Sequence, residues 1–223
     1  FYSEKYAHYN ADFICCKMTL EHIPNAAGFV NMVRRTIGKK KETIVFFQVP
    51  EVQRILGEQA FWDIYYEHCS YFDSASLSYL FQVCGFKVLS SWTDSGGQYL
   101  MIEARPSEET VTPGQNRVDR TTTKSLVADF SHLVQGKMNN WKKHIEELKT
   151  KNKKVVIWGS GSKAVAFLNI LGICHEIEFV VDINPFKCDT YIAGTVIIMN
   201  PTYRHEVQMY LTSLELFPEI LTV

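Results

Sequence analysis

Residues 12–49, "DFICCKMTLEHIPNAAGFVNMVRRTIGKKKETIVFFQV", carry the pattern that decides the fold. Two short apolar runs rich in β-forming residues, 12–16 and 43–49, enclose a stretch with helical character over 21–41. The helical stretch ends in a basic turn that contains Gly38, a common helix stop signal. A strand, a helix and a second strand at this spacing make a crossover unit, so the two strands are expected to lie parallel in one sheet.

A second helix and a hairpin are expected to complete this first lobe. Apolar residues recur at helical spacing over 74–86, and Gly85 closes the helix. Two runs rich in β-formers, 87–94 and 98–104, follow and are separated by a Ser-Gly-Gly turn. This pattern predicts two antiparallel strands.

A linker, a long helix and a second lobe are expected next. Residues 105–123 are polar and rich in Pro, Gly and Thr, which is typical of a linker. Apolar residues then recur at three- and four-residue steps over 126–148, which predicts one long amphipathic helix. Residues 153–173 read as strand, glycine turn and helix, and 177–185 and 196–200 read as further strands. The second lobe thus resembles half of a doubly wound fold.

The predicted fold class is α/β, with two Rossmann-like lobes joined by a linker and a long helix. The predicted ranges are 1–106 for the first lobe, 107–150 for the linker and helix, and 151–223 for the second lobe. The connection before 196–200 is shorter than a helical crossover needs, so additional residues are expected after Thr195. The chain also begins just before a strand, with no glycine-rich first turn. Both features indicate a part of a longer protein.

Composition narrows the class of protein. Of 223 residues, 46% are hydrophobic and 21% charged, and the formal net charge is −1, which is ordinary for a globular protein without a nucleic-acid or membrane partner. No apolar run approaches the ~18–20 residues that span a bilayer. The six cysteines show neither a C-x-x-C pair nor a zinc spacing, which favours reduced thiols in a cytoplasmic protein.

The glycine turn of the second lobe is the most familiar motif. Gly159, Ser160, Gly161 and Ser162 follow a strand and open a helix, and Asp182 ends the next strand. Such a turn lets backbone N–H groups approach a phosphate, so NAD binding is one interpretation. A tight turn in a Rossmann-like lobe that binds no dinucleotide is equally compatible with the sequence.

A second group of polar residues is expected at the rim of the first sheet. Glu21 and His22 follow the first strand, where ligands sit in open α/β sheets, although the same residues could simply cap a helix. Residues 62–72 place Tyr65, Glu67 and His68 among aromatic residues after the second strand. If this stretch is helical, Glu67 points away from Tyr65 and His68; if it is a loop, all three can converge. A core histidine and a general base are both open interpretations of His68.

In order, the segments "ADFICCKMTLEHIP", "FFQVP", "WDIYYEHCSYF", "LFQVCGFKV", "VVIWGSGSKAVAFLNILGI", "VVDINP" and "IIMNPTYRHE" resemble those of the three-domain S-adenosylmethionine (SAM)-dependent C-methyltransferases. The best-known members methylate nucleotide-linked keto-sugars. The resemblance implies that 1–106 is the second half of a methyltransferase domain and 151–223 a C-terminal Rossmann-like, substrate-binding domain. It also implies that a zinc-binding domain and the glycine-rich SAM loop precede Phe1.

The resemblance also implies roles for individual residues. Tyr65, Glu67 and His68 would line the active site with His68 as base, and His22 would lie near the substrate. The resemblance puts Cys16, Lys17, Met18 and Glu21 on the SAM side, and it assigns substrate binding to Gly159, Ser160, Gly161, Ser162, Asn200, Tyr203 and Arg204. Tyr66 and Met18 stand where the family usually has histidines, and Lys17 where it usually has Arg, which leaves the substrate open.

The implied reaction is methylation of a carbon next to a ketone. His68 would remove the proton, Tyr65 or His22 would hydrogen-bond the enolate oxygen, and Glu67 would orient His68 or the substrate, with no metal in this chain. The expected partner is a small keto compound, and the protein is expected to be a monomer or homodimer. Two alternatives stay open: an NAD-dependent oxidoreductase that uses the glycine turn and Asp182, and a non-catalytic nucleotide-binding scaffold.

Overall fold

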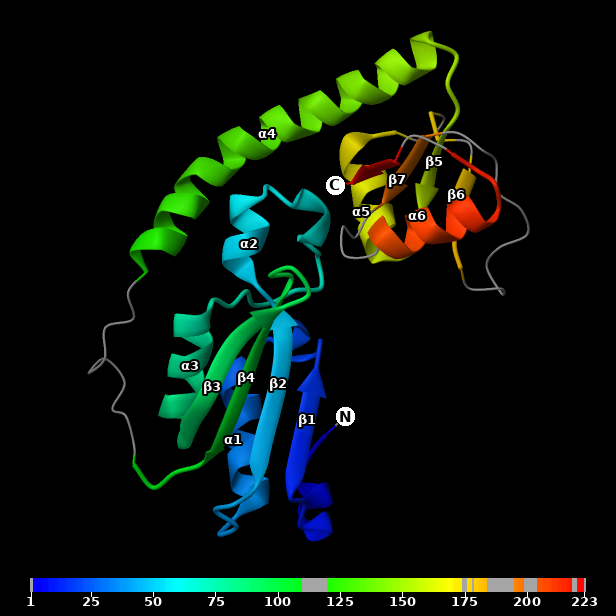
Figure 1. The fold of residues 1–223 in the computed structure, drawn as a ribbon. Helices are drawn as coiled ribbons and strands as arrows, with labels where there is room; N and C mark the ends of the chain where they lie inside the picture. The colour runs from blue at the N-terminus through cyan, green and yellow to red at the C-terminus, as the bar shows by residue number, and fades with distance from the viewer. Residues whose placement is uncertain are drawn as a thin grey trace. The chain divides into compact units, whose positions relative to one another are not determined.

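The computed structural model describes residues 2–109, 120–173, 176–177, 179–183, 195–198, 204–217 and 220–222. It divides into two compact units. One unit consists of Phe1–Gly57 and Tyr66–Ala128, and the other of Glu58–Tyr65 and Asp129–Val223. Each unit has its own sheet (Figure 1). The chain therefore contributes a short segment from the middle of the first lobe to the second unit.

The first unit is built on a mixed four-stranded sheet with the order β1-β2-β4-β3. β1 pairs parallel with β2, whereas β4 pairs antiparallel with both β2 and β3. The strands are β1 (Phe13–Lys17), β2 (Ile44–Pro50), β3 (Phe86–Asp94) and β4 (Tyr99–Pro106). The parallel crossover and the antiparallel pair predicted from the sequence are confirmed.

Two helices of the first unit pack on the sheet and make its core. They are α1 (Ala26–Ile37) and α3 (Ser74–Val83). Alternate residues of β2 face them, so the buried cluster includes Val45, Phe47 and Val49 with Val30 of α1 and Phe81 of α3. The remaining short elements are η1 (Glu4–Tyr9), η2 (Leu20–His22) and α2 (Val52–Gly57).

Helix α1 begins later than the sequence pattern predicts. The expected start was at residue 21, but Asn25 caps the helix by accepting the Gly28 N–H at 2.8 Å. Glu21 and His22 lie in the separate 3-10 turn η2 instead. The interpretation of these two residues as the cap of the next helix is therefore wrong.

The helical alternative for residues 62–72 is also wrong. Only the 3-10 turn η3 (Phe61–Asp63) forms there, and the chain then runs without a helix to α3. An isolated bridge between Phe72 and Glu51 ties the end of this loop to the residue that follows β2. The loop interpretation holds.

The second unit contains a parallel sheet with the order β6-β5-β7-β8. The strands are β5 (Val155–Trp158), β6 (Phe179–Val181), β7 (Thr195–Ile198) and β8 (Ile220–Thr222). Helices α5 (Ser162–Leu171) and α6 (Arg204–Ser213) belong to the same unit, as does most of the long helix described below. Thr195 and Val196 are consecutive in β7. Residues 184–194 lie outside the described residues, and additional residues after Thr195 stay a prediction.

The predicted long helix is confirmed as α4 (Thr121–Thr150), which extends beyond 126–148 at both ends. The predicted linker is shorter than 105–123, because Arg105 and Pro106 belong to β4 and 121–123 belong to α4. Within it, residues 110–119 lie outside the described ranges. Among the helices that the structure describes, none has both the length and the hydropathy that a membrane crossing requires.

Candidate active site

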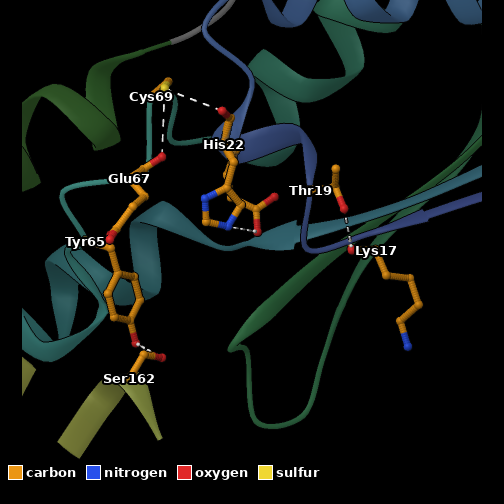
Figure 2. Close-up of polar contacts among 8 residues, drawn as sticks. Lys17, Thr19, His22, Tyr65, Glu67, Cys69 and Ser162 are labelled. Atoms are coloured by element: carbon orange, nitrogen blue, oxygen red, sulfur yellow. Dashed lines mark hydrogen bonds and ion pairs between the residues drawn. The ribbon is translucent and has the colours of Figure 1, made fainter. Parts of the chain in front are cut away.

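The chain turns sharply after β1 and brings candidate residues to the carboxyl ends of the parallel strands. Met18 has a φ of 47°, and its N–H still donates to a β2 carbonyl at 2.9 Å. The Thr19 hydroxyl donates to the Lys17 carbonyl at 2.9 Å and closes the turn (Figure 2). The 3-10 turn η2 follows at once, so Glu21 and His22 lie where ligands bind in open α/β sheets.

The loop that contains His68 is bound to η2 through its backbone. The Cys69 N–H donates to the Glu21 carbonyl at 2.7 Å. The Cys69 thiol lies 3.6 Å from the His22 carbonyl and 3.8 Å from the Glu67 carbonyl (Figure 2). These contacts fix His68, the residue between Glu67 and Cys69, next to the end of β1.

Glu21, His22 and His68 form one cluster. The two imidazole rings meet edge to face at an interplanar angle of 81°, with their centroids 4.7 Å apart. Glu21 Oε1 lies 3.9 Å from His22 Nε2. One donor atom from each of the three lies within 4.8 Å of the other two, which is close enough for the group to share a proton or a cation, a metal ion included. The sequence analysis did not anticipate this ligand set.

Glu21 supplies the carboxylate of the cluster that it forms with His22 and His68. The residue is 1% exposed, and neither side-chain oxygen has a hydrogen-bond partner among the described residues. Burial raises the pKa of Glu21 above its ordinary value of 4.5, and the neighbouring His22 lowers it by less. A buried carboxylate that accepts no hydrogen bond is costly, so this group favours either a proton or a positively charged ligand.

The other candidates on the SAM side lie along the same turn. Lys17 and Met18 are exposed, and Cys16 is half-buried. Burial raises the pKa of the Cys16 thiol to about 11, so that side chain is a neutral thiol at ordinary pH. Glu67 is exposed, and its carbonyl accepts from Cys69.

Tyr65 belongs to the second unit, whereas Glu67 and His68 belong to the first. Within the second unit the Ser162 hydroxyl donates to the Tyr65 hydroxyl at 3.3 Å (Figure 2). The motif of Tyr65, Glu67 and His68 is therefore divided between the two units, with the boundary directly after Tyr65.

The glycine turn of the second unit is closed by internal contacts. Gly159 has a φ of 99°, which favours glycine. The N–H of Ser160 donates to Asp182 Oδ2 at 3.1 Å, and the Ser160 hydroxyl donates to the same oxygen. Gly161 precedes α5. The Asp182 carboxylate is thus hydrogen-bonded to Ser160 of the glycine turn. This geometry favours a tight turn over the NAD interpretation, in which Asp182 would contact the ribose.

The remaining predicted substrate residues follow β7. Arg204 is the first residue of α6 and is exposed. Asn200 and Tyr203 lie outside the described residues.

Sequence reasoning missed two buried ionic groups near these motifs. Glu51, which follows β2, accepts the Arg54 N–H at 2.5 Å and caps α2, so its role is structural. Lys163, next to Ser162, pairs with Asp63 at 3.0 Å. No signal in the sequence links Asp63 to Lys163, which are 100 positions apart.

Comparison with known proteins gives matches in both parts of the chain. Residues 3–91 match a family described as a methyltransferase domain, and residues 104–210 match one described as a C-methyltransferase C-terminal domain. The C-methyltransferase NovU of Streptomyces niveus is 24% identical over 198 residues, which cover 84% of this chain and 47% of that protein. The chain thus spans about half the length of the curated relative it matches. Because residues 3–91 and 104–210 match these two families in this order, and the relative is itself a C-methyltransferase, the chain belongs to the SAM-dependent C-methyltransferase family.

Proposed function

We propose that this chain carries the acceptor-activating part of a SAM-dependent enzyme that methylates a carbon next to a ketone. The observation that carries the proposal is the cluster of Glu21, His22 and His68 at the carboxyl end of β1. A carbon atom becomes a nucleophile only after it loses a proton, so C-methylation needs a base at the reacting carbon. Within a C-methyltransferase family, this imidazole pair is a suitable base.

The chemistry of the cluster fits a cationic cofactor. When bound, SAM supplies an electrophilic methyl group on a positively charged sulfur. Neither oxygen of the buried Glu21 carboxylate has a hydrogen-bond donor among the described residues, so the carboxylate can serve as the counter-charge. In this proposal Cys16, Lys17, Met18 and Glu21 form the part of the SAM site that this chain contributes.

His68 acts as the general base in the proposed reaction. The C–H bond next to the carbonyl breaks, its proton passes to an imidazole nitrogen of His68, and the electron pair moves onto the carbonyl oxygen. His22 donates a hydrogen bond to that oxygen and stabilises charge that develops only in the transition state. The electron pair then returns to form the new carbon–carbon bond as the methyl–sulfur bond breaks.

The acceptor in this proposal is a small keto compound, with a nucleotide-linked sugar as the first candidate. Its binding is assigned to Tyr65 and to Gly159, Ser160, Gly161, Ser162, Asn200, Tyr203 and Arg204. The exposed guanidinium of Arg204 at the start of α6 supports an anionic group in the acceptor. Glu67 orients His68 or the acceptor. A cytoplasmic monomer or homodimer completes the proposal.

The test uses the full-length enzyme with SAM that carries a labelled methyl group and a panel of nucleotide-linked keto-sugars. Label should appear on a carbon next to the ketone. In deuterated water without SAM, the same carbon should exchange its hydrogen at a rate that depends on His68. Label found on oxygen or nitrogen would overturn the proposal, and so would tight NAD(H) binding without SAM binding in parallel titrations.

A further inference from the structure

The segment 58–65 is part of the second unit's core although it lies within the first half of the chain. Ala60, Phe61 and Trp62 are buried in the cluster that contains Val155 and Ile157 of β5 and several residues of α4 and α5. The Phe61 ring stacks on Phe167 of α5 at 5.8 Å between centroids. We call residues 58–65 the anchor segment. Its apolar side chains are a structural component of the second unit rather than a surface contact.

Polar contacts fix the anchor segment along its length. Lys137 Nζ donates to the Glu58 carbonyl at 2.8 Å and lies 4.7 Å from the centre of the Trp62 ring. The Tyr65 hydroxyl accepts from Ser162 at 3.3 Å. The contacts therefore hold both ends of the segment, first at Glu58 and last at Tyr65.

An ion pair joins Asp63 of the anchor segment to Lys163 of α5. Lys163 Nζ lies 3.0 Å from Asp63 Oδ1 and 3.1 Å from Oδ2, so both carboxylate oxygens face the ammonium group. The two side chains are only 9% and 21% exposed. Removal of one partner from a buried ion pair leaves an uncompensated charge, which makes the pair highly sensitive to single substitutions.

This pair gives the start of α5, which follows the glycine turn, a structural role that is separate from NAD binding and from acceptor binding. The turn residues Gly159–Gly161 lead directly into α5, and Lys163 is the second residue of that helix. In a phosphate-binding loop a lysine at such a place would face the ligand, but here its ammonium group faces Asp63. The start of α5, which follows the turn, thus holds the anchor segment through Ser162 and Lys163.

We propose that Asp63 and Lys163 are positioning residues for the loop that carries Glu67 and His68. The anchor segment ends at Tyr65, the chain enters the first unit at Tyr66, and Glu67 and His68 follow within a few residues. A displaced Asp63 would shift the start of the loop that carries His68, and a misplacement of about 1 Å can cost on the order of 100-fold in rate. This inference rests on the proposed function for its effect on turnover, although the anchoring itself does not.

The experiment compares full-length wild-type enzyme with Lys163→Met, Lys163→Arg and Lys143→Met. Lys163→Met keeps most of the side-chain stem but removes the charge, whereas Lys163→Arg preserves it. Lys143→Met is the matched control, because it breaks an exposed pair with Glu147, at 3.8 Å, in the same unit. Each protein is measured by hydrogen–deuterium exchange over 58–72, by SAM binding, and by kcat and KM.

We expect faster exchange over 58–72 in Lys163→Met and a kcat lowered by about 10- to 100-fold, with the Kd for SAM unchanged. Lys163→Arg should recover most of the rate, and Lys143→Met should match wild type. Wild-type exchange over 58–72 in Lys163→Met would overturn the anchoring, and faster exchange with unchanged kcat would overturn the positioning role. A wild-type enzyme without C-methylation would reject the proposed function, while the exchange data would still decide the anchoring.

Discussion

The imidazole of His22 meets the imidazole of His68 edge to face, at 4.7 Å between ring centroids, although the two residues come from separate segments of the chain. His22 follows β1, and His68 lies in the loop after α2 that is hydrogen-bonded to η2. The parallel pair of β1 and β2 brings both segments to one edge of the mixed sheet, because these two strands end on the same side. The crossover topology thus brings the two segments together, and the backbone hydrogen bonds to η2 hold the rings in contact.

Replacement of His68 tests this pair as the base. In the full-length enzyme, His68→Ala and His68→Gln should lower kcat by about 10²–10⁴-fold, because a general base contributes that much, with SAM binding little changed. Steady-state kinetics and calorimetric titration with SAM measure the two quantities. His132→Gln, an exposed histidine of α4, is the control. Near-normal turnover in both His68 variants would remove His68 from the mechanism.

Glu21 should make stability depend on pH. Burial raises its pKa above 4.5, so the folded protein holds a proton that the unfolded chain has released at a pH above that value. The contribution of Glu21 to stability is therefore present at low pH and is lost as the pH rises from about 4.5 through the raised value. Glu21→Gln removes this dependence, so the Tm of the variant relative to wild type should increase over that window. Thermal melts in a pH series, without SAM, measure it, and a constant difference would contradict the assignment.

Asp73 should contribute stability with the opposite pH dependence. Burial alone would raise the pKa of Asp73, but hydrogen bonds from Thr123 and Ser76 to its carboxylate outweigh this and lower the pKa below 3.8. Its contribution is complete above about pH 3.8 and is lost as the pH falls through the lowered value.

Because Asp73 also caps α3 in a capping box, Asp73→Ala should cost about 1–2 kcal/mol of unfolding free energy at neutral pH. Denaturant titration measures the loss. Asp129→Ala, at an exposed position of α4, is the control and should be near neutral. An equal, small effect of both substitutions would show that the cap contributes little.

The cysteines of the first unit should divide into two reactivity classes. Burial raises the pKa of Cys16 and of Cys84 to about 11, so few thiolates form at neutral pH. Cys15 and Cys69 are exposed. Brief treatment with iodoacetamide, followed by peptide mass spectrometry, should label Cys15 and Cys69 first. Labelling of Cys16 as fast as Cys15 would indicate that the end of β1 is open to solvent.

The sequence predicted those features that have a short-range signal. The crossover of β1, α1 and β2 follows from apolar runs and helical spacing within a few turns of chain, and the α4 periodicity is equally local. The start of α1 was misplaced because Glu21 and His22 are compatible with a helix, and only the Asn25 cap decides the boundary. Residues 62–72 were ambiguous for the same reason, since aromatic residues pack equally well from a helix or a loop.

The ion pair of Asp63 and Lys163 has no such signal. The two residues are 100 positions apart, and neither belongs to a periodic pattern that would link them. The 4.7 Å approach of His22 and His68 depends likewise on hydrogen bonds to the backbone of η2, which side-chain identities do not encode. The candidate residues and their common rim could therefore be predicted from the sequence, but the contact between the two imidazole rings and the hydrogen bonds that hold it could not.

The interleaving of the two units has a consequence for biosynthesis. Phe61 and Trp62 leave the ribosome long before α5, whose Phe167 ring they pack against. Until translation passes Leu171, these rings lack the α5 side chains that cover them in the folded protein. They are then a target for chaperones that recognise apolar segments. A truncation after β4 would leave them permanently uncovered, so expression of the first lobe alone should yield aggregates unless residues 58–65 are redesigned as a polar loop.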